Sequence, residues 1–276
     1  MLFSPFLFIS FVLLVMSVHY IIPVRLRYLW LLFCSYAFCL TYGVRPLFVL
    51  LCTTLISFFT GLILERTIDG EKNRLVQRLV LCFGLICCIG PLIFAKIGYS
   101  FFAVVGISFY TLQEIGYLFD IYRKKIRAEK HLIYYALYIA FFPKLVSGPI
   151  ESSDHLLKQI NEINETSFQY DRVKSGLLLM LWGFVQKTVI SDTFAIYVDK
   201  VYGHWEAYSG AMIILATIVF AFQLYADFAG YTNIVLGASQ IFGFQLKENF
   251  AQPYFAVSIK DFWRRWHISL STWLRE

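Results

Sequence analysis

Long apolar runs, separated by short charged segments, occupy the first half of the chain. The uncharged runs cover residues 1–22, 28–44, 46–64, 79–95 and 97–113, and the last stays apolar to about residue 122. Each is close to the roughly 17–25 residues that a helix needs to cross a bilayer. The pattern predicts five transmembrane helices within residues 1–131. The first run lacks a basic start, so it is predicted to be a membrane helix and not a cleaved signal peptide.

Basic residues are distributed unevenly between the segments that join these runs. Eleven Lys and Arg residues fall in residues 23–27, 65–78 and 123–131, whereas the other two segments carry only Arg45 and Lys96. Short loops rich in Lys and Arg stay in the cytoplasm. The distribution therefore predicts that these three segments are cytoplasmic and that the N-terminus lies outside.

The middle of the chain follows a less regular pattern. The apolar stretch 132–151 contains Pro143, Gly148 and Pro149, and breaks of this kind leave backbone groups unpaired in lipid. We expect a re-entrant or interior segment there. The more polar residues 152–172 are expected to form a surface helix.

Further spans are predicted in residues 173–246. Residues 207–246 carry one charged side chain, Asp227, and forty residues suit two spans better than one, with a break at 227–233. The alternative is a single tilted helix with Asp227 near the middle of the bilayer, where a carboxylate costs about 2.5–3.5 kcal/mol. Another span is expected from about residue 173 to 198, in which Gln186, Lys187 and Asp192 must face protein or water.

These elements predict an all-α polytopic membrane protein of about eight membrane segments in a single domain. The chain is 59% hydrophobic and 15% charged, with a mean hydropathy of +0.65, which is more apolar surface than a soluble domain can bury. The net charge of +6 does not indicate nucleic-acid binding, because the cations flank membrane runs and suit lipid headgroups. The six cysteines lie in apolar runs without CxxC spacing, and no metal-binding motif occurs, so no metal is expected.

The last stretch, residues 258–276, has helical periodicity. At 100° per residue its apolar side chains fall within about 60° of one line, and a basic face lies on another side. The apolar set is Ile259, Phe262, Trp263, Trp266, Leu270, Trp273 and Leu274. The pattern predicts one amphipathic helix lying in a membrane interface.

His267 lies where the two faces of this helix meet, close to Arg264 and Arg265. A neutral imidazole is a natural general base for a hydroxyl proton, and the two arginines are expected to lower its pKa. The alternative, which the spacing alone favours, is an interfacial anchor without a chemical role.

Other polar residues stand inside apolar runs. Asp227 and Asn233 are predicted either to line a substrate tunnel or to make internal hydrogen bonds, and both readings stay open. Gln113 and Glu114 lie deep in the fifth run, and Asp120, nearer its cytoplasmic end, is expected to pair with Arg123 or Lys124.

Four blocks in this order resemble the membrane-bound O-acyltransferase family, in particular its bacterial branch for alginate O-acetylation. They are GISFYTLQEIGYLFDIYR (106–123), FFPKLVSGPIE (141–151), QLYADFAGYTNIVLG (223–237) and the most specific, ENFAQPYFAVSIKDFWRRWHISLSTWLR (248–275). The resemblance implies a helix bundle around a central tunnel in a bacterial inner membrane. It also implies transfer of an acyl group, here acetyl, from a cytoplasmic thioester donor such as acetyl-CoA or an acyl carrier. The acceptor would be an extracytoplasmic polysaccharide, reached through periplasmic O-acetyltransferase partners, with no bound cofactor.

The resemblance also assigns site residues. His267 matches the first of two family histidines, and the main catalytic histidine is expected beyond Glu276, so we expect the N-terminal portion of a longer enzyme. Residues expected near the substrate or tunnel are Asp227, Asn233, Gln113, Arg264, Trp263 and Trp266. The alternatives are a transporter for a lipid-linked or polysaccharide substrate, a non-catalytic scaffold, and an inactive truncated acyltransferase.

Overall fold

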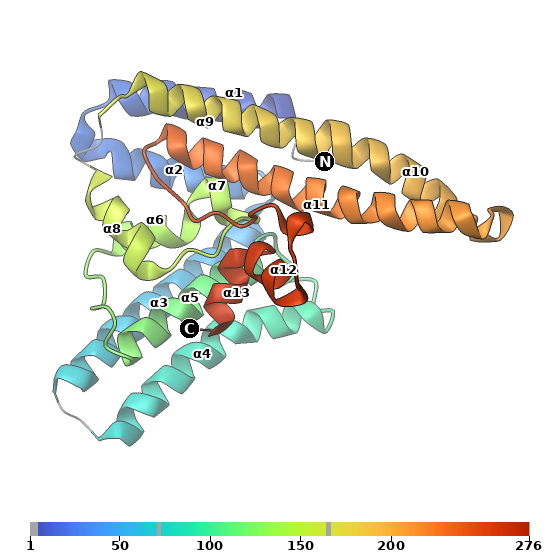
Figure 1. Ribbon diagram of the computed structural model, residues 1–276. Coiled ribbons are helices and arrows are strands. Elements are labelled where there is room, and N and C mark those ends of the chain that lie inside the picture. The colour runs from blue at the N-terminus through green and yellow to red at the C-terminus, as the bar shows by residue number, and fades with distance from the viewer. Residues whose placement is uncertain (1–4, 71–72, 164–166, 276) are drawn as a thin grey trace. The chain divides into compact units, whose positions relative to one another are not determined.

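The computed structural model describes residues 5–70, 73–163 and 167–275, and these residues form helices joined by turns, with no strand among them (Figure 1). The predicted all-α class is confirmed. The chain forms two compact units: the first contains residues 1–168 and 269–276, and the second contains residues 169–268. The beginning of the first predicted run, residues 1–4, and Glu276 lie outside the described residues.

Most predicted runs form helices in the first unit. The first four of these helices are α1 (Pro5–Ile21), α2 (Arg27–Leu40), α3 (Val44–Asp69) and α4 (Arg74–Lys96). They are followed by α5 (Ile107–Tyr122), α6 (Leu132–Ala140), α7 (Phe142–Leu145) and α8 (Ser153–Asn161), and by α13 (Ile268–Arg275), nearly all of which belongs to this unit.

Small residues let α3, α4 and α5 pack closely. A Cβ added to Gly84 of α4 would lie 2.5 Å from Cγ2 of Thr60 on α3, and one added to Gly61 of α3 would lie 2.7 Å from the ring of Tyr117 on α5. Between membrane helices, contacts of this kind replace the hydrophobic effect as the source of packing energy.

The fifth predicted run is shorter in the structure than in the sequence pattern. Residues 97–106 form turns, and α5 begins only at Ile107. Gly98 and Gly106 both have left-handed backbone angles (φ 101° and 79°), and a Cβ on Gly106 would lie 2.1 Å from the Leu145 carbonyl oxygen. The two glycines therefore favour turns in residues 97–106, and the helix covers only the later part of the predicted run, although the whole run is apolar.

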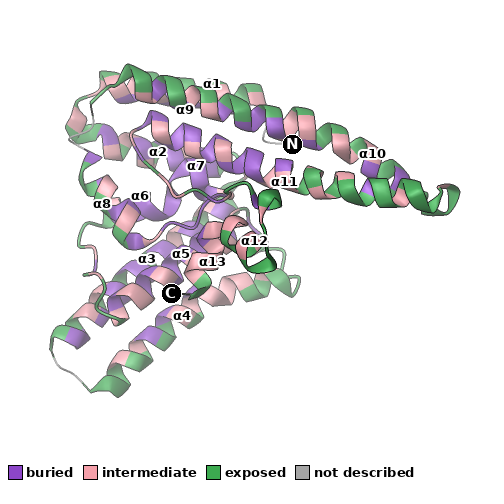
Figure 2. Ribbon diagram, viewed as in Figure 1, coloured by how far each residue is buried: buried purple, intermediate pink, exposed green. Residues whose placement is uncertain are grey.

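The break predicted in residues 132–151 is confirmed. Helix α6 stops at Ala140, and the short α7 starts at Phe142. The Phe142 N–H, which the break leaves without a helical partner, donates to Oγ of Ser35 on α2 at 3.1 Å. Residues Tyr135 to Ala140 are all buried, as Figure 2 shows for α6. This segment is therefore interior to the unit, as predicted.

The second unit consists mainly of two long helical segments. The first runs without interruption through α9 (Tyr170–Phe184), a π-helical stretch (Val185–Ser191) and α10 (Asp192–Gly203). The second is α11 (Gly210–Ile241), which runs alongside it (Figure 1).

The preferred prediction of two spans in residues 207–246 is wrong, and the single-helix alternative is correct. Helix α11 continues through residues 227–233 without a break. No proline interrupts it, and its one charged residue, Asp227, is paired with Lys187 of the π-helical stretch. The 32 residues of α11 extend about 48 Å, longer than the roughly 30 Å of a bilayer core.

Four glycines bring α9 and α11 into backbone contact. Gly176 and Gly183 on α9 face Gly237 and Gly230 on α11. A Cβ on Gly237 would lie 2.4 Å from the Gly176 carbonyl oxygen, and one on Gly183 would lie 2.5 Å from the Gly230 carbonyl oxygen. Because the obstructing atoms belong to the backbone, no side-chain rotation could make room for a larger residue.

The predicted continuous amphipathic helix at residues 258–276 is wrong. The segment forms α12 (Ile259–Arg265) and α13, separated by a turn at Trp266 and His267. His267 has a left-handed backbone angle (φ 46°), which ends the helical path. The hydrophobic periodicity could not reveal this turn, because the periodic pattern continues through Trp266 and His267 without interruption.

Four helical segments in the described residues are long and apolar enough to cross a membrane: Val44–Asp69, Arg74–Lys96, Tyr170–Gly203 and Gly210–Ile241. Helix α1 is apolar but shorter. The chain is thus a multi-pass membrane protein, and the number of about eight membrane segments stays a prediction.

The α9–α11 contact predicts the effect of one methyl group. We expect Gly183→Ala to destabilise the second unit by roughly 1–3 kcal/mol, because the methyl overlaps backbone atoms of α11. Thermal unfolding of the purified protein in detergent measures this. Gly210→Ala, at the start of α11, is the control, because a Cβ there has no atom within 4 Å. Equal melting temperatures for the two variants would contradict the proposed contact.

Candidate functional site

The turn that carries His267 is held on both sides by one extended segment of the second unit. The Ala251 N–H donates to the Arg265 carbonyl at 3.0 Å, and the Ile268 N–H donates to the Asn249 carbonyl at 2.9 Å. These two bonds replace the helical bonds that are lost at the turn. A left-handed angle at a residue other than glycine costs roughly 1 kcal/mol or more, and such residues cluster at functional sites.

Aromatic residues surround the turn. The His267 ring packs against Phe228 of α11, with ring centroids 4.9 Å apart. The neighbouring Trp266 contacts Phe250 (5.1 Å) and stacks on Phe262 (5.5 Å, 16° between planes). The turn is therefore packed against α11 at Phe228, the residue next to Asp227.

Burial lowers the pKa of the His267 imidazole below its usual value of about 6.5. The predicted direction is confirmed, but the cause is desolvation and not the neighbouring arginines. Its Nδ1 atom is buried and makes no hydrogen bond to another described residue. The imidazole is thus neutral near pH 7, the form that can accept a proton.

The other predicted residues of this block are at the surface of the described structure. Arg264 is exposed, and the Trp263 side chain is 56% exposed. The arginine with a defined ion pair is Arg265, whose Nε lies 3.0 Å from a carboxylate oxygen of Asp261. Trp266, in contrast, belongs to the aromatic cluster around His267.

Asp227 and Asn233 each have a partner on the π-helical stretch. Lys187 donates to the Asp227 carboxylate, and the Asn233 amide donates to Oε1 of Gln186 at 2.6 Å. The Asp227 side chain is still 49% exposed. Gln186 and Lys187 were recognisable in the sequence as polar residues in a span, but their partners were not, because 40 or more residues separate the members of each pair.

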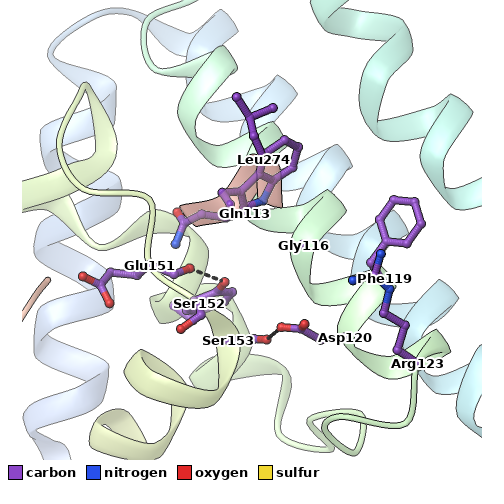
Figure 3. Close-up of a pocket in the computed structure, with 11 residues that line it drawn as sticks. Gln113, Gly116, Phe119, Asp120, Arg123, Glu151, Ser152, Ser153 and Leu274 are labelled. Carbon is purple, nitrogen blue, oxygen red and sulfur yellow. Dashed lines mark hydrogen bonds between the residues drawn. The ribbon is translucent and has the colours of Figure 1, made fainter. Parts of the chain in front are cut away.

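A separate cavity of about 220 Å³ lies within the first unit (Figure 3). Gln113 of α5 lines it, together with Tyr138 of α6 and Trp273 of α13. The remaining lining residues are Gly116, Phe119, Asp120, Arg123, Glu151, Ser152, Ser153 and Leu274. Of these lining residues, only Gln113 was predicted to be near the substrate or tunnel, and Trp273 was predicted to lie at a membrane interface. Instead, the Trp273 indole N–H donates to the Leu112 carbonyl at 3.1 Å, beside Gly116.

Asp120 has a structural role in the wall of this cavity. Its carboxylate accepts a hydrogen bond from Oγ of Ser153 at 2.6 Å and lies 3.7 Å from Nζ of Lys125. An ion pair with Arg123 or Lys124 was expected, but the basic residue that pairs with Asp120 here is Lys125. The Ser153 contact joins α5 to the start of α8.

The fold and the arrangement of these residues are those of a multi-pass membrane protein with buried polar groups at helix breaks. The family model of the membrane-bound O-acyltransferase family matches residues 122–276, more than half of the chain. The chain belongs to this family.

Individual relatives are named as O-acetylases, O-acetyltransferases or D-alanyltransferases. The chain is 34% identical to a probable alginate O-acetylase of Pseudomonas fluorescens over 99% of this chain and 55% of the relative. It is 31% identical to the peptidoglycan O-acetyltransferase of Helicobacter pylori, over 90% of this chain and 54% of the relative. It is 33% identical to the teichoic acid D-alanyltransferase of Bacillus subtilis over 50% of this chain. The chain spans about half the length of the first two relatives.

The lowered pKa of His267 predicts a pH-dependent stability. The unfolded chain takes up a proton at a higher pH than the folded chain, so this contribution to stability is complete above about pH 6.5 and is lost as pH falls through the folded pKa. We expect the melting temperature to fall less for His267→Asn than for the unmodified protein between about pH 7.5 and pH 5. Asn does not titrate and tolerates a left-handed backbone angle. An identical fall in both proteins would contradict a buried, neutral His267.

Proposed function

We propose that this chain is part of a bacterial inner-membrane O-acyltransferase. It would transfer an acetyl group from a cytoplasmic thioester donor, acetyl-CoA or an acyl carrier protein, towards an alginate-like polysaccharide outside the cytoplasm. Periplasmic O-acetyltransferases would complete the transfer. Family membership supports the reaction class, and the names of the relatives support a cell-surface acceptor.

The observation that carries this proposal is the His267 turn. An acceptor hydroxyl must lose its proton as its oxygen attacks the thioester carbonyl, and the thiolate leaves when the tetrahedral intermediate collapses. A neutral imidazole with a lowered pKa is suited to accept that proton or to orient the hydroxyl. The strained backbone at His267 and the aromatic cage hold the ring in one position. We assign His267 an assisting role in this proton transfer.

Asp227, Asn233 and Gln113 are proposed to line the path of the substrates. An intramembrane carboxylate that remains half exposed needs water or a polar ligand nearby, which supports a polar path at Asp227. Asn233 would act through its partner Gln186. Trp263, Arg264 and Trp266 are proposed to stand where this path meets the membrane interface.

The orientation and the domain organisation are also proposals. Residues 1–131 would contribute five transmembrane helices, residues 132–172 a re-entrant segment and a surface helix, residues 173–246 further spans, and residues 247–276 an interfacial segment. All of them would belong to one acyltransferase domain. The distribution of Lys and Arg supports an N-terminus outside the cytoplasm.

The partly exposed ion pair between Lys187 and Asp227 is also the kind of group that a transporter uses, so transport of a lipid-linked or polysaccharide substrate is the second candidate. The two candidates differ at His267, because acyl transfer needs a group that accepts the proton of the acceptor hydroxyl, and transport does not.

We expect His267→Asn to lower acyl transfer about 100-fold, because it removes the base and keeps a residue that accepts the backbone angle. The measurement is transfer of labelled acetyl groups to polysaccharide in cells that express the protein from its own locus. His204→Asn is the matched control, since His204 is exposed at the end of α10. Transfer that continues unchanged in His267→Asn would refute the role of His267. No transfer by the unmodified protein, with partner proteins still co-purifying, would favour a scaffold.

The proposed orientation predicts opposite behaviour for two loops. Alkaline phosphatase, which is active only outside the cytoplasm, should be active when inserted at residue 100 and inactive when inserted at residue 127. Green fluorescent protein at the same two sites should give the reverse result. The opposite pattern would place the N-terminus in the cytoplasm.

A further inference from the structure

Two hollows lie next to each other in the first unit, beside the turn between α2 and α3 and the loop between α4 and α5. The first has a volume of about 410 Å³ and is lined by residues 42–46, Ser100 and residues 103–105. The second, of about 330 Å³, is lined by the end of α4, the same loop and the start of α5. Ala103 and Val104 belong to the walls of both, so the two hollows are neighbours.

Each hollow contains one cation, one aromatic ring and one serine hydroxyl. In the first hollow these are Arg45, Tyr42 and Ser100, and in the second they are Lys96, Phe109 and Ser108. Both cations are exposed. Among the described residues, no acidic side chain lines either hollow. The two hollows therefore present the same combination of groups, and in each the positive charge has no acidic side chain beside it.

The positions of Arg45 and Lys96 in the chain are unusual for cations. Both stand on segments that are proposed to lie outside the cytoplasm, where Lys and Arg are less frequent, and every acidic residue of residues 1–113 lies in the segment 65–78. Lys96 is in the last turn of α4, where the helix dipole favours a cation, but Arg45 is in the first turn of α3, where the dipole opposes one. Helix stability therefore does not explain Arg45, whereas an anion bound in the hollows explains both cations.

Aromatic contacts hold the walls of the hollows in place. Phe94 of α4 stacks on Phe102 of the loop, with ring centroids 5.6 Å apart, and Phe48 of α3 contacts Phe101 at 6.4 Å. At the end of the loop, Gly106 packs closely against a backbone carbonyl of α7. The hollows are therefore formed before any ligand binds, which lowers the entropic cost of binding.

A uronate unit of a polysaccharide carries a matching set of groups. Its carboxylate pairs with a guanidinium or ammonium group, the apolar face of its ring suits an aromatic side chain, and its hydroxyls form hydrogen bonds with serine. The polymer repeats this set from one sugar to the next, as the two hollows repeat theirs. A lipid headgroup supplies an anion but no repeated ring, and a neutral polysaccharide leaves both cations without a counter-charge.

We propose that the two hollows form one binding surface for a carboxylate-bearing polysaccharide, in which Arg45 and Lys96 each pair with the carboxylate of a sugar unit. The proposal rests on the proposed function and orientation, and it names the chemical class of the acceptor: a polymer that contains uronate units, outside the cytoplasm. The surface binds the polymer beside the membrane and takes no part in the transfer of the acyl group.

Two oligosaccharides with equal numbers of rings test the proposal: a mannuronate hexamer and the neutral cellohexaose. Binding to the whole protein in phosphatidylcholine nanodiscs is measured by isothermal titration calorimetry. We expect the mannuronate hexamer to bind about tenfold more tightly than cellohexaose. Raising the salt concentration from about 0.1 M to about 1 M should remove most of this difference, because salt screens charges at exposed sites. Equal binding of the two oligosaccharides at low salt overturns the proposal.

Substitutions of the two cations locate the binding surface. Arg45→Gln and Lys96→Gln should each weaken binding of the mannuronate hexamer about threefold, and together about tenfold, to the level of cellohexaose. Arg45→Lys keeps the charge and should keep the binding. Arg74→Gln is the matched control, because Arg74 is exposed in the first turn of α4, in a segment proposed to be cytoplasmic, and lines neither hollow. Unchanged binding in the folded double variant, or an equal loss in Arg74→Gln, refutes the assignment.

A lipid headgroup is the other anion that two exposed cations attract, and native mass spectrometry distinguishes it. If phosphatidylglycerol remains bound to the unmodified protein and is lost from the double variant, while the two oligosaccharides bind equally, the hollows hold a lipid and the proposal is overturned.

These binding measurements are independent of acyl transfer. Loss of transfer in His267→Asn with the mannuronate hexamer still bound would leave the binding surface intact, and so would a protein that transfers no acyl group at all. Conversely, alkaline phosphatase that is inactive at residue 100 would place the hollows in the cytoplasm. That result would overturn the polysaccharide site and leave the role of His267 standing.

Discussion

Polar groups buried inside a membrane protein have little water to bind, so most of them need a partner within the protein. This constraint accounts for the main polar contacts of both units. In the first unit Ser35 satisfies the backbone at the break between α6 and α7, and Lys144 meets Gln113. In the second unit Lys187 meets Asp227. The helix breaks and the intramembrane charges persist because these partners exist.

The glycine contacts of the second unit serve the same constraint. Gly183 and Gly230 bring the backbones of α9 and α11 together, and a Cβ on Gly230 would lie 2.9 Å from the backbone nitrogen of Lys187. The neighbouring side chains of the π-helical stretch are thereby brought within reach of α11. A wider helix separation would leave the Asp227 carboxylate without its lysine. Close packing and ion pairing are therefore two consequences of the same small residues.

The apolar runs predicted most helices of the fold because their length and lack of charge are properties of the local sequence. The errors arose where distant residues decide the outcome. The break expected at residues 227–233 is absent, since Lys187 stabilises Asp227 inside an unbroken α11. The turn at His267 was hidden within continuous periodicity, because it depends on hydrogen bonds to Asn249 and Ala251. Likewise His267 was recognisable as a candidate base, whereas the reason for its lowered pKa, burial against Phe228, required the fold.

Two amides illustrate how polar side chains in apolar helices are paired across the fold. Asn233 and Gln113 both lie in apolar helices, and the sequence pattern does not distinguish them. The NH₂ group of Asn233 donates to Gln186, so its hydrogen-bonding capacity is used to join α11 to the π-helical stretch. In Gln113 the oxygen accepts a hydrogen bond from Lys144, so this amide joins α5 to α7 in the first unit. In both cases the partner is distant in the sequence, 47 residues away for Asn233 and 31 for Gln113, so only the fold identifies it.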